Sequence, residues 1–496
     1  MSKLNLLKKF CKVRPITGYC LVLFFAFLFF GICWNVKSYL LVYFVIGSLL
    51  FFCLEDSFEN LTFKLLLLSL PFEKGIRSWV VSVVSAGPEL WQSGYSFYFG
   101  FSIKLILVTL SFLLFLKTFF KKKINLKFDL INFLPLLMFF WAILSSLKAE
   151  NFNWAALGLL RLVTGFFLFY LGKTFFDKKN MRVFFSIFLL FLLVFSGIFG
   201  FRQFVSKGPV GIFLEDRWYE APYAWFTNEN ELLFRVSGLM SHPTFYGSFM
   251  CLLVFVALGK IVEVLIVNKK KDFVFWLAML GMILGLVSIF GTYSRSSWLA
   301  MLAGGFVFFI RFCVNKKNIG INKTSERRTV FIFVLLILLF VFFNGSSLWS
   351  RVESFKNIFS LGSGRGRLVL IGESIKMIKA FPLFGVGLNH FTAVMSRWNN
   401  NPEVQGFMFP VHNTFLLFAS EIGLPFCLLF ILFIVKLFYY IFKKVKLNWF
   451  NFGVMIGAIT FLINSQFHTL FNQDASFEMF MIILAYLISL PKNAKI

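Results

Sequence analysis

The chain has 496 residues, of which 59% are hydrophobic and only 14% are charged, and its mean hydropathy is +0.82. This composition excludes a single soluble domain, because one core cannot bury so much apolar surface, and it requires lipid as a solvent. The formal net charge of +27 comes from short Lys and Arg clusters between apolar runs, a pattern that orients membrane proteins, so nucleic acid is not an expected partner.

The apolar runs predict an all-α, polytopic integral membrane protein with about 12–14 transmembrane helices. The first run, 16–33, follows a basic start and has no cleavage site of small residues after it, so we expect a retained span and a cytoplasmic N-terminus. The stretch 61–72 is short for a span, yet it must cross if both termini are cytoplasmic. The other expected spans are 39–54, 101–119, 130–147, 154–175, 183–201, 243–267, 273–291, 296–312, 329–344, 413–441, 449–466 and 475–490.

The same alternation of basic turns divides the chain into three regions. We expect N-terminal transmembrane helices over 1–343, which include an outer loop at 202–242, and C-terminal transmembrane helices over 412–496. Between them lies a long, partly helical extracytoplasmic loop over 344–411. The loop 202–242 is rich in acidic and aromatic residues, which is typical of an interfacial belt and also suits a platform that stacks on sugars.

An amphipathic helix is expected within the long loop. Leu368, Ile371, Ile375 and Ile378 recur at helical spacing, which predicts a helix that lies on the membrane or caps the bundle and stops at Pro382.

A turn with two glycines follows this helix. Gly385 and Gly387 form a GxG pattern, which either packs as a plain turn or supplies backbone amides that bind an anion.

Three charged or titratable residues stand at expected membrane boundaries on the outer side: Arg235, Arg295 and His412. Each residue alone could have a structural role, as an interfacial anchor or a helix cap, but the three together suggest a functional site. Two guanidinium groups can bind a pyrophosphate in a bidentate manner, and a neutral imidazole can take a proton from a sugar hydroxyl near pH 7. This combination favours glycosyl transfer from a polyprenyl-pyrophosphate donor.

The sequence predicts that this chemistry needs neither a metal nor another cofactor. It contains no Asp-x-Asp motif, no pair of histidines at i, i+4 and no CxxC pair. Arginine would therefore neutralise the leaving pyrophosphate. We expect the dipole of the helix that starts after His412 to keep this imidazole neutral.

The residues in question resemble a known family. The order RVSG with HPTFYG, TYSRSSW, FPLFGVGLNHF and finally HN ahead of EIG is similar to the O-antigen ligase and polymerase superfamily of bacterial envelope glycosyltransferases. The resemblance covers roughly 210–440 in motifs and nearly the whole chain in topology. It departs from the usual ligase pattern at Phe426, where ligases have a second glycine.

The resemblance implies a site, substrates and a location. It implies that Arg235 and Arg295 hold an undecaprenyl-pyrophosphate-linked glycan donor and that His412 is catalytic, activating an acceptor such as the lipid A core or a growing glycan. It further implies a multi-pass protein of the bacterial inner membrane, in contact with membrane lipids, whose site faces the periplasm. The residues that we additionally assign to substrate binding are Asn413, Arg365, Gly385 and Gly387.

Two alternatives to a ligase stay open at this stage. One is an O-antigen or exopolysaccharide polymerase of the same superfamily. The other is a transporter of the bicarbonate type, which should carry charged residues deep in its spans, where the sequence offers Arg161 and Glu263.

Overall fold

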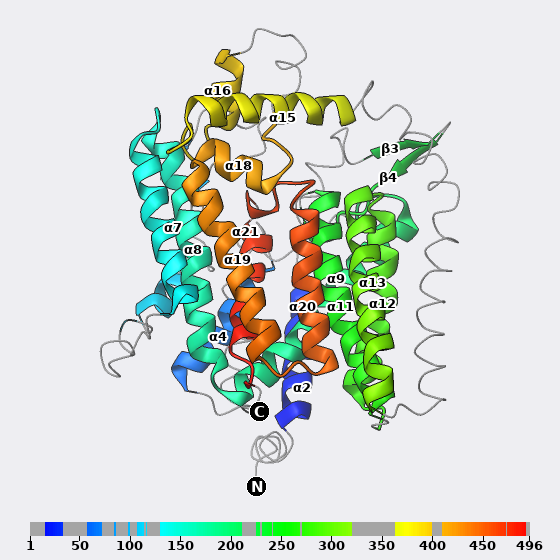
Figure 1. Cartoon of the computed structure of the whole chain (residues 1–496). Coiled ribbons are helices and arrows are strands. Elements are labelled where there is room, and N and C mark those ends of the chain that lie inside the picture. The colour runs from blue at the N-terminus through cyan, green and yellow to red at the C-terminus, as the bar shows by residue number, and fades with distance from the viewer. Residues whose placement is uncertain are drawn as a thin grey trace.

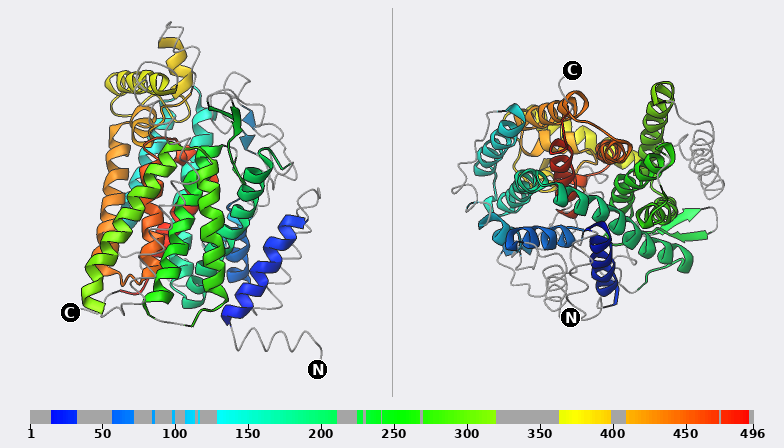
Figure 2. Two further views of the ribbon diagram at one scale, coloured as in Figure 1. Left: turned by 90° about the vertical axis from the view of Figure 1, so that its right-hand side faces the viewer. Right: turned by 90° about the horizontal axis from the view of Figure 1, so that it is seen from below.

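A bundle of long helices makes up most of the structure, a computed structural model (Figure 1). The structure describes residues 15–32, 57–71, 84–85, 98–99, 107–113, 116, 129–210, 225–228, 231–240, 242–267, 270–319, 363–398, 409–472 and 474–492. In the view from below, the helices stand side by side with their axes roughly parallel (Figure 2). The expected spans 39–54 and 329–344 lie outside the described residues.

Seven helices among the described residues are long and apolar enough to cross a membrane. This confirms the predicted all-α polytopic class. These seven are α7 (Leu130–Leu147), α8 (Phe152–Phe176), α9 (Lys179–Ser206), α11 (Pro243–Ile266), α12 (Phe273–Gly291), α13 (Arg295–Ile319) and α19 (Leu424–Lys444).

Shorter helices complete the described bundle. The stretch predicted at 61–72 forms α4 (Phe58–Ser69), which has 12 residues. Three further helices are apolar but below the length of a full span: α2 (Pro15–Ile32) in its apolar part, α20 (Trp449–Asn464) and α21 (Asp474–Ile488). A 3-10 turn, Leu470–Asn472, leads into α21.

The expected single span over 413–441 is wrong, because the chain breaks there into α18 (Thr414–Glu421) and α19. Gly423 adopts a positive φ of 101°, and Pro425 follows in the first turn of α19, where its missing N–H is not needed. The amide of Leu424 donates to the carbonyl of Pro382 at 2.8 Å. A side chain at Gly423 would collide with the Leu383 carbonyl, so the break is shaped to fit the glycine turn.

The helix α15 (Ser363–Ala380) crosses one end of the bundle at a steep angle to the spans (Figure 1). We call this the α15 end. The helix is the one predicted in the long loop, but the face that it buries differs from the expected one. Leu370 and Met377 are buried, whereas Leu368 and Ile375 are 44% and 43% exposed. The apolar stripe expected to pack is therefore split between a buried face and an exposed face.

Two short hairpins accompany the helices. The strands β3 (Trp225–Asn228) and β4 (Glu231–Phe234) pair antiparallel within the loop expected at 202–242, with Trp225 opposite Phe234. The strands β1 (Val84–Ser85) and β2 (Tyr98–Phe99) form the second pair. A helix α16 (Phe391–Trp398) follows the glycine turn. Residues 211–224 and 229–230 of this loop lie outside the described residues, so the sugar platform stays a prediction.

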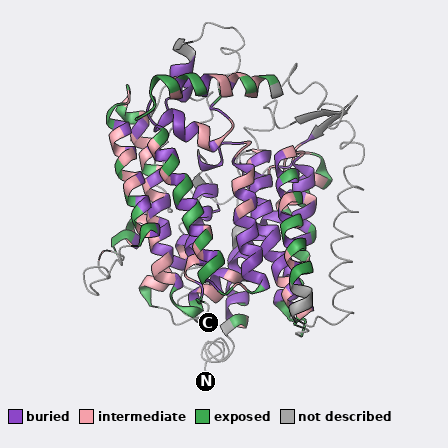
Figure 3. Cartoon of the chain, in the orientation of Figure 1, coloured by how far each residue is buried: buried purple, intermediate pink, exposed green. Residues whose placement is uncertain are grey.

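The centre of the bundle is packed through glycines. A Cβ atom at Gly453 would collide with the Phe255 carbonyl, and one at Gly457 with the Leu252 carbonyl, so α20 and α11 approach to backbone contact. The central helices α9 and α11 are mostly buried, whereas α13 and α19 expose apolar side chains such as Phe306 and Leu428 (Figure 3). Such outward apolar faces suit contact with lipid.

Candidate active site

Arg235 and Arg295 are brought together by the turn between α12 and α13. The Nε atom of Arg235 donates to the carbonyl oxygen of Thr292 at 2.9 Å, and the amide of Val236 donates to the carbonyl of Gly291 at 2.8 Å. Arg295 begins α13 directly after this turn. Two arginines that are 60 positions apart in the sequence are therefore fixed to the same turn at the α15 end.

The segment after Arg235 is held from its other side by α9. The side-chain oxygen of Gln203, which is buried, accepts hydrogen bonds from the amides of Ser237 at 3.0 Å and Gly238 at 2.7 Å. Gly238 has a positive φ of 53°, which allows the chain to turn there toward α11. The position of the Arg235 backbone is thus set by α9 and by the α12–α13 turn together.

His412 lies immediately before α18. Its Nδ1 atom is 3.0 Å from the carbonyl oxygen of Pro410. A carbonyl oxygen only accepts, so Nδ1 carries the proton and Nε2 carries the lone pair in the neutral ring. This tautomer leaves Nε2 as the nitrogen that can take a proton.

Asn413 has a structural task beside His412. Its side-chain oxygen caps α18 by accepting from the Leu416 amide at 3.0 Å, and its Nδ2 donates to the side chain of Gln466 at 3.2 Å. The amide of Thr414 donates to the Ser465 carbonyl at 2.9 Å. These bonds join the start of α18 to the connection after α20.

This junction creates a cluster of three histidines. The ring centroids of His412 and His468 are 4.9 Å apart, and those of His242 and His468 are 5.5 Å apart. His242 is the N-cap of α11, where its Nδ1 accepts from the Thr244 amide at 3.1 Å. Three of the four histidines of the chain therefore meet at the ends of α11, α18 and α20. In the described part of the chain, no three His, Cys, Asp or Glu side chains are grouped so that they could hold a metal ion.

A third arginine, Arg367 on α15, belongs electrostatically to the same site. Burial lowers the pKa of Arg367, and the charge of Arg295 lowers it further. Burial, together with the charges of Arg367 and Arg295, lowers the pKa of Arg235 to about 10. Three guanidinium groups from three segments thus act on one another while all stay protonated near pH 7.

The histidines are neutral in this environment. Burial, with a contribution from the charge of Arg367, lowers the pKa of His412 to about 4. Burial also holds the pKa values of His242 and His468 well below the ordinary value, and the neighbouring arginines and histidines lower them further. His412 is therefore neutral at pH 7 as expected, but burial and Arg367 are the causes, in place of the helix dipole.

The glycine turn uses its amides within the protein. The amide of Gly385 donates to the Phe381 carbonyl at 3.0 Å, and the amide of Gly387 donates to the Glu421 carbonyl at 2.8 Å. Both glycines have positive φ, 66° and 103°. This geometry favours the packing turn over the anion-binding turn.

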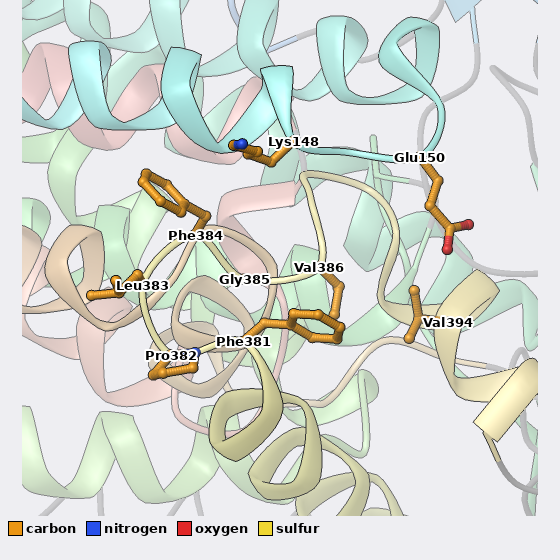
Figure 4. A pocket seen from close by; sticks show the side chains of 9 residues that line it. All are labelled: Lys148, Glu150, Phe381, Pro382, Leu383, Phe384, Gly385, Val386 and Val394. Carbon is orange, nitrogen blue, oxygen red and sulfur yellow. The ribbon is translucent and has the colours of Figure 1, made fainter.

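A pocket of about 410 Å³ lies against this turn (Figure 4). Lys148 and Glu150, from the turn between α7 and α8, stand on one side of it, and Phe381 and Pro382 stand on the other. Its lining includes none of the three arginines and three histidines described above.

The structure separates the residues expected at the site. It places Arg235 within electrostatic reach of Arg295 and, like His412, of His242, and Asn413 caps α18 beside His412, whereas Arg365 is exposed on α15. The substrate-binding roles of Asn413, Arg365, Gly385 and Gly387 stay predictions. Sequence reasoning missed His242, His468 and Arg367, although the presence of only four histidines in the chain was a signal.

Part of the chain is similar to a known protein family. Residues 280–431 match the family model described as O-antigen ligase. The matched segment contains Arg295, the whole of α15 with Arg367, and His412. The comparison with curated proteins gave no match. The matched segment is less than a third of the chain, and it supports a relationship to the O-antigen ligase and polymerase superfamily.

Proposed function

We propose that this protein is a membrane glycosyltransferase that moves a glycan from undecaprenyl pyrophosphate to an acceptor hydroxyl. The observation that carries the proposal is the meeting of Arg235 and Arg295 with a neutral His412 at one end of a membrane bundle. The match of residues 280–431 to the O-antigen ligase family supports a lipid-linked glycan and an acceptor as the substrate classes.

The two arginines are suited to the leaving group. A guanidinium group presents planar, paired N–H donors that match phosphate oxygens, and it stays charged when it is partly buried. When the bond between the sugar C1 and the pyrophosphate oxygen breaks, its electron pair goes to that oxygen and the leaving group gains negative charge. Arg235 and Arg295 would stabilise that charge in the transition state.

His412 is suited to the acceptor. As the new bond forms between C1 and the acceptor oxygen, the hydroxyl proton passes to Nε2, because Nδ1 is already protonated and bonded to Pro410. The products are the transferred glycan, undecaprenyl pyrophosphate and a protonated His412, which then returns its proton to solvent. We propose that neither a metal nor another cofactor takes part.

The acceptor separates the two superfamily activities. We propose ligation to the lipid A core or a similar acceptor, with polymerisation onto a growing glycan as the second candidate. The observation that supports the polymerase as the second candidate is Phe426, which stands at the place where ligases have a glycine. Phe426 is buried and packs edge-to-face on Phe418, with ring centroids 5.2 Å apart.

A transporter finds less support in the structure. Glu263, one of the charged residues within a span, accepts from the amide of Phe450 at 3.2 Å. Phe450 lies in the first turn of α20, where amides have no partner within the helix. Glu263 therefore serves as a cap between two helices, and this role explains a half-buried charge without transport.

The test is transfer by purified protein in liposomes, with the lipid-linked glycan as donor. Arg295→Lys keeps the charge but loses the paired donors, so we expect transfer to fall by about tenfold or more. Arg202→Lys is the matched control, because Arg202 is exposed near the end of α9. Transfer at the wild-type rate by Arg295→Lys would mean that this arginine serves only as a membrane anchor. Loss of transfer by the wild type in the presence of a chelator would contradict the metal-free mechanism.

The proposed location is the inner membrane, with the α15 end in the periplasm. A cysteine at Ser363, where α15 begins, should react with an impermeant thiol reagent in intact cells whose outer membrane has been made permeable. A cysteine at Asn318, near the far end of α13, should not react. The reverse labelling pattern would put the site in the cytoplasm and would exclude the proposed substrates.

A further inference from the structure

Arg367 lies on the inward face of α15. It precedes Leu370, Ser374 and Met377 at spacings of three, four and three residues, which place all four on one side of a helix. Leu370, Ser374 and Met377 are at most 1% exposed. The helical phase therefore directs Arg367 toward the bundle, and it directs Arg365, two residues earlier, to the exposed side.

α15 is fixed to α18, the helix that His412 precedes. The hydroxyl of Ser374 donates to the Leu416 carbonyl at 3.2 Å, and Leu370 and Met377 share an apolar cluster with Leu417. Since the start of α18 holds His412, the inward face of α15 also approaches the histidine cluster. The electrostatic influence of Arg367 on His412, His242 and His468 agrees with this placement.

We propose that Arg367 is a third residue that binds the pyrophosphate of the donor, together with Arg235 and Arg295. This inference rests on the proposed function. The three guanidinium groups come from three segments and repel one another, so an anion carrying at least two charges would offset that repulsion. Arg367 would also meet the added negative charge that appears on the leaving group when the C1–O bond breaks.

The position of Arg367 near both groups has a second consequence. A cation that binds the donor and also acts on His412 links the two halves of the reaction. When the pyrophosphate binds, its negative charge compensates Arg367, and the tendency of His412 to accept a proton increases. The base would thereby gain strength only when a donor is present.

The experiment compares six variants of the full chain in detergent: Arg367→Gln, Arg367→Lys, Arg365→Gln, Arg235→Gln, Arg295→Gln and Lys379→Gln. Lys379 is the matched control, because it is an exposed cation on the same helix. Binding of undecaprenyl pyrophosphate is measured by fluorescence titration, and transfer is measured as a function of pH. Thermal unfolding shows which variants are folded.

For Arg367→Gln we expect about tenfold weaker binding of undecaprenyl pyrophosphate, the usual effect of losing a charge-assisted hydrogen bond. We also expect the midpoint of the acidic limb of the pH profile of transfer to rise toward the ordinary histidine pKa. The removal of a cation near His412 raises the pKa of this residue. Arg367→Lys should keep the wild-type midpoint of the acidic limb, and it should bind undecaprenyl pyrophosphate with an affinity between those of the wild type and Arg367→Gln. Lys379→Gln should change neither quantity.

The outcomes distinguish this inference from the function on which it rests. Only the role of Arg367 would be overturned if Arg367→Gln bound undecaprenyl pyrophosphate as the wild type does and kept the wild-type midpoint of the acidic limb, while Arg235→Gln and Arg295→Gln bound it more weakly. Weakened binding in Arg365→Gln alone would move the role to the exposed arginine. Unchanged binding in all the arginine variants would overturn the proposed function itself. If Arg367→Gln does not fold, Arg367→Lys decides the question through its binding strength.

Discussion

Two histidines of this chain, His390 and His412, sit at the same end of the bundle in contrasting surroundings. His390 is 1% exposed; its Nε2 accepts from the Asn151 amide at 3.1 Å, and its Nδ1 donates to the Leu388 carbonyl at 2.6 Å. Both ring nitrogens are thus used to join the start of α8 to the glycine turn. His412 uses Nδ1 in the same way, but its ring lies beside another histidine, with its centroid 4.9 Å from that of His468.

The difference shows how one residue type is assigned either to structure or to chemistry. A histidine with two backbone partners is locked in one tautomer and gains nothing from changing its charge. In His412 the bond from Nδ1 to the Pro410 carbonyl fixes the tautomer and leaves Nε2 as the nitrogen that can take a proton, which is what a general base requires. We therefore expect loss of His390 to affect stability and loss of His412 to affect the reaction.

The largest effect is expected for His412→Ala. Transfer should fall by about 10²- to 10⁴-fold, the usual contribution of a general base. Binding of undecaprenyl pyrophosphate should persist, because the arginines hold it, and thermal unfolding should stay close to that of the wild type. Single-turnover kinetics separate the chemical step from binding. Transfer at a near wild-type rate would exclude His412 as the base.

A smaller effect on transfer is expected for His390→Ala. The Asn151 amide loses its acceptor at the start of α8, which should lower the free energy of unfolding by about 1–3 kcal/mol. The protein that stays folded should transfer glycan at the wild-type rate. Thermal unfolding in detergent, followed by transfer per folded molecule, measures both quantities. A large loss of transfer per folded molecule would contradict the proposal that His390 has a structural role and only His412 acts in the reaction.

The sequence predicts much of this fold because lipid imposes simple rules on it. The spans over 130–147 and 273–291 agree with α7 and α12 at both ends, since each run is apolar and is bounded by a capping Asp129 or Asp272. The break at Gly423 was missed because the apolar residues on both sides of Glu421 and Gly423 together have the length of one span. Only the contact with the glycine turn, distant in sequence, explains why the chain must bend there.

The site was predictable where a residue stands beside a recognisable boundary. Arg295 and His412 stand at helix starts, and the sequence therefore predicts both as site residues. His468 lies in a short connection with no motif around it, and its role depends on the hydrogen bonds that join α18 to the end of α20. Arg367 and Arg365 cannot be told apart without the phase of α15, which follows from which face packs on α18.

The smallest expected effect is the change of the transfer rate with pH, which tests directly whether His412 is the base. An ordinary imidazole is about nine-tenths protonated at pH 5.5, so a base of that kind would lose about tenfold in rate between pH 7.5 and pH 5.5. Burial and Arg367 lower the pKa of His412 to about 4, so its neutral form persists at pH 5.5. We therefore expect kcat/KM for the donor to change by less than about twofold over this interval.

The same shift makes a control necessary. Below the ordinary histidine pKa, the unfolded chain binds more protons than the folded one, because burial lowers the pKa values of His412, His242 and His468 in the folded state. The free energy of unfolding should therefore fall as the pH drops through this window. Thermal unfolding at each pH separates this loss from an effect on chemistry. An acidic limb with its midpoint near the ordinary imidazole value, in protein that is still folded, would contradict the lowered pKa of His412 on which this prediction rests.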